Sequence, residues 1–145
     1  MFRSARGAYE VAVKATESSR ELEAAALTKA ARLLDECRHG WNEPDRANRL
    51  EEALRFNQRL WTFFQAELTR PGHEMPRELR VNLLSLSAFV DRRTFELLAE
   101  PRAEGLQALV DINRNIALGL KESAARPPAS APPPAPSTRA TDRMG

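Results

Sequence analysis

The sequence predicts an all-α protein, a small bundle of about five helices followed by a disordered, Pro-rich tail. Apolar residues recur every three or four positions through most of the chain, which is the period of an amphipathic helix. No segment shows the strict alternation of apolar and polar residues that is typical of a strand. Residues 123–145 hold six of the ten prolines and no Leu, Ile, Val or aromatic residue, so they cannot contribute to a core.

Residues 50–68 predict the central helix of the bundle. On a helix their apolar side chains cover about half of the circumference, whereas a surface helix shows a stripe a little over ~100° wide. The stretch also holds three of the six phenylalanines, and aromatic side chains bury ~150–250 Å² each. We therefore expect neighbours on two sides of this helix. One face holds Leu50, Ala53, Leu54, Asn57, Leu60, Trp61, Phe64 and Leu68, with Phe56 and Phe63 at its margin.

Two helices are expected before the central one. Residues 5–16 have the pattern of a short amphipathic helix. Residues 18–21, Ser-Ser-Arg-Glu, fit the capping box S-x-x-E, in which the first and last side chains satisfy each other's unpaired backbone N–H groups. A second helix is expected to start there and to end at Gly40, a residue type that favours the end of a helix.

Two further helices are expected after the Pro-Gly loop near residue 71. The fourth, residues 76–99, has two apolar sides, one with Leu79, Leu83, Leu86, Val90 and Leu97, the other with Val81, Leu84, Ala88 and Phe95. Pro101 breaks it. The fifth, residues 101–121, presents Leu106, Leu109, Val110, Asn113, Ile116, Ala117 and Leu120. The chain thus divides into a helical domain, residues 1–121, and a tail, residues 122–145.

Composition disfavours several classes of function. The net charge of +2 is spread over mixed signs, without the clustered basic stripe that is typical of nucleic-acid binding. The single cysteine, Cys37, excludes an internal disulfide framework and is typical of a reducing cytoplasm. No apolar run is long enough to span a membrane. His39 and His73 match no metal-binding spacing, and no Gly-rich phosphate loop is present, so we expect neither an enzyme nor a cofactor or metal.

Asparagines and surplus apolar residues are the candidates for a binding function. Asn57, Asn82 and Asn113 lie on or beside apolar helix faces, where they either bond across helices or line a groove. The apolar residues that exceed one core face either fill the interior or form an exposed patch, and exposed patches bind partners. The expected partner-binding residues are Phe56, Phe63, Val81, Leu84 and Phe95.

Several segments of the chain together form a distinctive set of motifs: Tyr9, Thr16, SSRELEAAALTKAARLL, RFNQRLW, MPRELRVNLLSLSAFVDRRTFELL and LVDINRNIALGLK. This set resembles the FlaF flagellar biosynthesis regulator family. The most specific pieces are Asn57 with Leu60-Trp61, and the INRNIA run that contains Asn113 and Asn115. The chain departs from the family pattern at Ser19, where proline is common, and in its Pro-rich tail. We interpret Asn57, Trp61, Asn82, Asn113 and Asn115 as structural or motif residues.

The resemblance implies a cytoplasmic regulator that promotes flagellin synthesis and assembly, in balance with the repressor FlbT. It further implies that flagellin is bound before export, with an amphipathic terminal helix of flagellin lying in a groove. The alternative is an RNA-binding regulator of flagellin message. The nearest support for RNA binding is a group of four arginines, Arg77, Arg80, Arg92 and Arg93. Glu78 and Asp91 interleave this group, and so sparse a basic cluster favours the chaperone hypothesis.

Overall fold

The structure, a computed structural model, describes residues 5–72 and 75–125, with side chains from residue 19 on, except that of Ala124. This part of the chain is all-helical, which confirms the expected fold class. It contains four α-helices, α1 (Ala5–His39), α2 (Arg46–Leu68), α3 (Arg77–Ala99) and α4 (Gln107–Ala125), and a 3-10 turn, η1 (Ala103–Leu106), before α4. The expected boundary at residue 121 falls inside α4, and residues 126–145 of the expected tail lie outside the described residues.

The prediction of five helices is wrong, because the first two are one continuous helix. α1 runs for 35 residues through the Ser-Ser-Arg-Glu sequence that was expected to start a new helix. Residues 8–39 contain neither proline nor glycine, so nothing interrupts the backbone ladder, and each further residue of a formed helix adds a hydrogen bond. The helix ends where Gly40 was expected to end it, and the Gly40 N–H donates to the Glu36 carbonyl at 2.9 Å.

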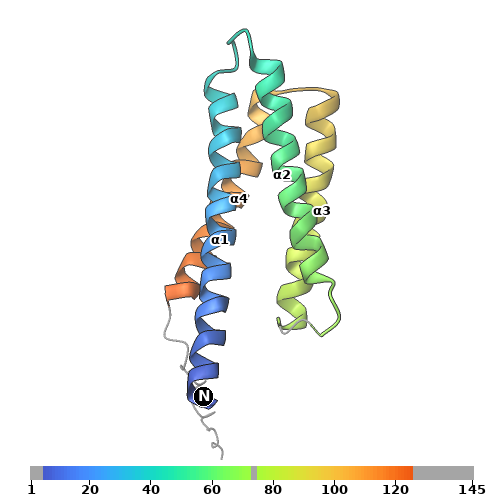
Figure 1. The fold of residues 1–145 in the computed structure, drawn as a ribbon. Coiled ribbons are helices and arrows are strands. Elements are labelled where there is room, and N and C mark those ends of the chain that lie inside the picture. The colour runs from blue at the N-terminus through green and yellow to red at the C-terminus, as the bar shows by residue number, and fades with distance from the viewer. Residues whose placement is uncertain (1–4, 73–74, 126–145) are drawn as a thin grey trace, which may run out of the picture.

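The helices run alternately up and down, and they form two pairs (Figure 1). α1 packs along α4, and α2 packs along α3, while α1 and α2 also contact each other. At one end of the bundle, which we call the closed end, η1 contacts α1, α3 and α4. At the other, which we call the open end, the α1–α4 pair and the α2–α3 pair diverge (Figure 1).

The core is densest toward the closed end. A single hydrophobic cluster joins all four helices and η1, and its fully buried large side chains are Leu27, Leu34, Leu54, Trp61, Val90, Leu97, Leu106, Leu109 and Val110. Gly105 permits a close approach between η1 and α3, because a Cβ at this position would lie 2.7 Å from Leu97 Cδ2. The Arg93 guanidinium also donates to the Gly105 carbonyl oxygen at 2.9 Å. These contacts fix the end of α3 on the bundle.

Exposure rises along one face of α3. Val90 and Leu97 are buried, Leu83 and Leu86 are half-buried, and Leu79 near the open end is exposed. All five residues belong to the face expected to be core. The face is therefore core in its C-terminal half and only partly covered in its N-terminal half.

Candidate binding cleft at the open end

A buried chain of hydrogen bonds crosses the bundle between α2 and α4. The Trp61 Nε1–H donates to Asn113 Oδ1 at 2.9 Å, and Asn113 Nδ2 donates to Asn57 Oδ1 at 2.8 Å. Because the indole N–H is only a donor, it determines which atom of the Asn113 amide faces it. Asn57 Nδ2 is buried and has no partner in the described part of the chain. The three residues thus join α2 and α4 through their side chains.

The other two motif asparagines lie outside this chain of hydrogen bonds. Asn82, on α3, and Asn115, on α4, are exposed to solvent. Asn115 follows Asn113 by two residues, and positions two apart on a helix point to different sides. The INRNIA run therefore places one asparagine in the core and one at the surface.

Next to Trp61, toward the open end, lies a pocket of about 140 Å³. It lies between the two diverging helix pairs, and its lining residues are Glu23, Trp61, Phe64, Glu67, Leu68, Met75, Leu83, Ile116 and Leu120. An apolar protein cavity of ~150 Å³ holds a molecule such as benzene, so the pocket has room for about one large apolar side chain. We call this pocket the cleft.

Apolar residues form most of the cleft wall, and they continue the core outward. Trp61 is almost fully buried and packs edge to face with Phe64, with the two ring centroids 5.6 Å apart. Leu83 lies on the same face of α3 as the buried Val90 and Leu97. Leu68 is buried at the end of α2. The cleft is therefore the outer end of the core, left uncovered where the helix pairs diverge.

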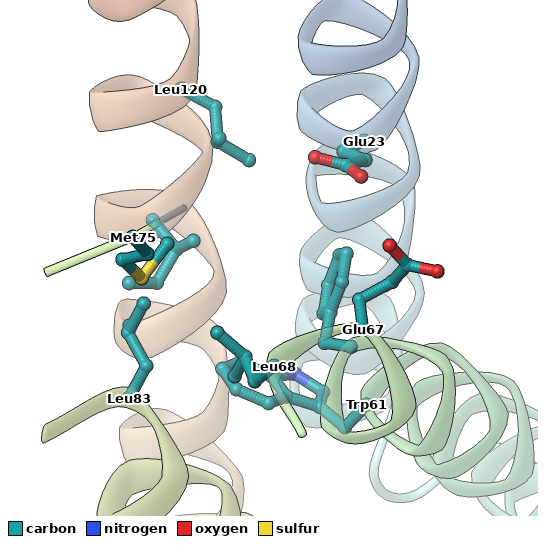
Figure 2. Close-up of a pocket in the computed structure, with 9 residues that line it drawn as sticks. Glu23, Trp61, Glu67, Leu68, Met75, Leu83 and Leu120 are labelled. Carbon is teal, nitrogen blue, oxygen red and sulfur yellow. The ribbon is translucent and has the colours of Figure 1, made fainter. Parts of the chain in front are cut away.

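One side of the cleft is acidic. Figure 2 shows Glu23, from α1, and Glu67, from α2, on one side of the pocket, and Met75 and Leu83 on the other. Burial raises the pKa of the Glu23 carboxyl above its ordinary value, the neighbouring Glu67 raises this pKa further, and Arg20 acts against both. Glu67 is paired at 2.7 Å with Arg70, which follows it by three residues. The cleft thus combines an apolar wall with two carboxylates.

None of the five residues expected to bind a partner lines the cleft. Val81 and Phe95, on the outer side of α3, are exposed, and Leu84 is half-buried beside them in sequence. Phe63, on α2, is exposed, with its ring centroid 5.7 Å from that of Phe64. Phe56 is half-buried, with the Lys29 ammonium 4.9 Å from its ring centroid. The structure therefore shows two separate candidate surfaces, the cleft and the outer side of α3.

The arginines considered for RNA binding do not all lie free on the surface. The Arg92 and Arg93 guanidinium groups lie 5.8 and 5.0 Å from the Phe89 ring centroid. Arg93 also pairs with Glu96 at 3.3 Å and, as described above, bonds to η1. Arg93 therefore serves the packing of α3.

The described residues contain no cluster of metal-binding side chains. In this part of the chain, no group of three or more His, Cys, Asp or Glu side chains is placed to hold a metal ion. Burial raises the pKa of the Cys37 thiol, which disfavours the reactive thiolate. No helix among the described residues has the length and apolarity that a membrane span requires.

The fold and the cleft together define a small helical-bundle protein with a partly acidic, mostly apolar cleft at one end. The family model "Flagellar protein FlaF" matches residues 5–120, so the chain belongs to the FlaF family of flagellar proteins, which is not a known enzyme family. Every residue that lines the cleft falls within the matched range. The comparisons with curated proteins and with solved structures gave no match.

Proposed function

We propose that this protein binds flagellin in the cytoplasm as an export chaperone, and that it thereby promotes flagellin synthesis and assembly in balance with FlbT. The observation that carries the proposal is the cleft, where the apolar core continues to the surface between two helix pairs. Membership of a flagellar protein family supports flagellin as the partner.

An amphipathic helix is the guest that suits this cleft best. Helices from both pairs contribute apolar side chains, as a groove for a helix requires. Covering the exposed Leu79 and the half-buried Leu83 and Phe64 would remove apolar surface from water, which favours binding by ~25 cal/mol per Å². The terminal segments of flagellin are amphipathic helices, so one of them would lay its apolar face over the cleft and insert one large apolar side chain into it.

The outer side of α3 is the competing surface for the same guest. Leu83 lines the cleft, whereas its neighbour Leu84 does not, although both are half-buried. This pair of adjacent leucines gives matched variants. Leu83→Asp places a charge in the cleft, and Leu84→Asp places the same charge on another side of the same helix turn.

Calorimetric titration of the full chain with flagellin tests the proposal. We expect the wild-type protein to bind, Leu83→Asp to lose about tenfold or more in affinity, and Leu84→Asp to bind nearly as well as wild type, since only the charge at position 83 would be buried unpaired under the bound helix. Melting temperatures show whether each variant is folded. Loss of binding by a folded Leu84→Asp with retention by Leu83→Asp would move the site to the outer side of α3.

A parallel titration with flagellin leader RNA addresses the alternative function. We expect no specific binding, because Glu78 and Asp91 interleave the candidate arginines and Arg93 is paired with Glu96. Tight binding to the leader RNA that falls steeply with salt, combined with no binding to flagellin, would overturn the proposal in favour of an RNA-binding regulator.

A further inference from the structure

The Glu23 carboxylate has no partner across the cleft. It is half-buried at the acidic side of the pocket, and among the described residues no basic group lies within ion-pair distance of it. The other carboxylate of the pocket, Glu67, is paired with Arg70 on its own side of the cleft. Arg20, one turn before Glu23 on α1, exerts only a longer-range attraction. Glu23 is thus a partly desolvated negative charge facing a second one.

A guest that covers the cleft must also cover Glu23. Removing more water from an unpaired carboxylate is unfavourable, because the lost hydration is not replaced. A cationic side chain from the guest replaces that hydration and also relieves the repulsion between Glu23 and Glu67. An acidic side chain in the same place adds a third negative charge. Two guests that bury the same apolar area therefore bind the cleft with different affinities, according to the charge beside their apolar face.

We propose that Glu23, with Glu67 beside it, selects a guest helix that carries a lysine or arginine at the edge of its apolar face. The apolar wall supplies affinity for any amphipathic helix, and the carboxylates supply the discrimination between helices. The basic residue of the guest lies on the α1–α2 side of the cleft, and the apolar residues lie toward Met75 and Leu83 on the opposite side (Figure 2). This inference rests on the proposed function, and it names the feature of flagellin that the cleft recognises.

The test is a double-mutant cycle between the full-length protein and synthetic peptides of the flagellin terminal helices. Each Lys and Arg of the peptide is replaced in turn by Gln, and affinities are measured for wild type and Glu23→Gln. We expect Glu23→Gln to weaken binding of the unaltered peptide about tenfold, and one basic position of the peptide to produce the same loss. The two changes together should cost little more than either one alone.

Glu21→Gln is the matched control. Glu21 lies on α1 two residues before Glu23, is exposed and does not line the cleft. At each salt concentration we expect Glu21→Gln to bind the peptide with the same affinity as wild type. The difference in affinity between wild type and Glu23→Gln should instead shrink as the salt concentration rises.

The outcomes separate this inference from the proposed function. Peptide binding that Glu23→Gln leaves unchanged or strengthens would overturn the selection by charge and leave the chaperone proposal standing. The selection by charge would also be overturned if, for every peptide substitution, the loss of binding free energy in the double variant equalled the sum of the losses from Glu23→Gln and from the peptide substitution. If the wild-type chain binds neither flagellin nor its terminal peptides, both proposals fail together.

Discussion

Leu79 and Leu97 lie five turns apart on the same face of α3, and their surroundings are opposite. Leu97, at the closed end, is 0% exposed, and Leu79, at the open end, is 48% exposed. Eighteen residues of helix separate them by about 27 Å. The closed end has η1 packed on α3, with Gly105 against Leu97. The open end has the cleft and two carboxylates instead.

The difference shows what ends the core. The buried hydrogen bonds of Trp61, Asn57 and Asn113 link the two helix pairs at the inner side of the cleft. Beyond them, Glu23 and Glu67 face the same space, and like charges oppose closer approach. The same apolar face therefore stabilises the fold at one end and remains available for a partner at the other.

The largest expected effect comes from replacing a leucine by alanine at the closed end of α3, compared with the same change at its open end. Leu97→Ala should lower the free energy of unfolding by about 2–5 kcal/mol, as expected for a fully buried leucine. Leu79→Ala should lower it by about 1 kcal/mol or less, because about half of this residue is already exposed to water. Urea denaturation measures both. Equal losses would show that the open end is as well packed as the closed end.

The asparagine variants should have the next largest effects. Asn113→Ala leaves both the Trp61 indole N–H and Asn57 Oδ1 without a partner, at about 1–3 kcal/mol for each buried group. Asn57→Ala leaves only Asn113 Nδ2 unpaired and removes an amide N–H group that is already unpaired, so it should destabilise less. Urea denaturation of both single variants and of the double variant shows which change lowers the free energy of unfolding more. A larger loss for Asn57→Ala would contradict this account of the link.

Two glycines sharpen the comparison at a smaller scale. Gly105→Ala forces the new methyl group against Leu97 in a packed core, which costs about 1–3 kcal/mol. Gly119→Ala, on α4, meets nothing within 4 Å, and replacing a helical glycine by alanine gains about 0.5–1 kcal/mol. Thermal melts should thus move in opposite directions. A stabilising Gly105→Ala would mean that η1 has room to shift away from α3.

The smallest expected effect is the pH dependence contributed by Glu23. The pKa of its carboxyl is raised in the folded protein, so the folded state holds this proton more tightly than the unfolded state does. Stability from this group therefore falls as pH rises above the unfolded value of ~4.3 through the folded pKa. Glu23→Gln should match wild type in acid and be slightly more stable at neutral pH. Greater stability of wild type at neutral pH would contradict the repulsion between the carboxylates.

Much of the fold follows from the sequence, and the cleft does not. Helical periodicity identifies the buried faces of α2 and α4, including Trp61 and Asn113, because it reports which side chains share a side. It places Leu79 and Leu97 on one face without indicating that Leu97 is buried and that Leu79 is exposed. The capping-box pattern misled for a related reason: Ser and Glu at that spacing are compatible with the interior of a helix as well as its start. Glu23 and Glu67 carry no sequence signal, since solvated carboxylates on helices are common.

The most direct test of a binding cleft at the open end is methyl NMR of the protein with flagellin terminal peptide. The chain has two isoleucines, and one of them, Ile116, lines the cleft, whereas Ile112 lies one turn closer to the closed end. Met75 supplies a second probe in the cleft. We predict that the peptide shifts the methyl signals of Ile116 and Met75 strongly and that of Ile112 much less. Binding measured by calorimetry that leaves Ile116 and Met75 unmoved would contradict the account.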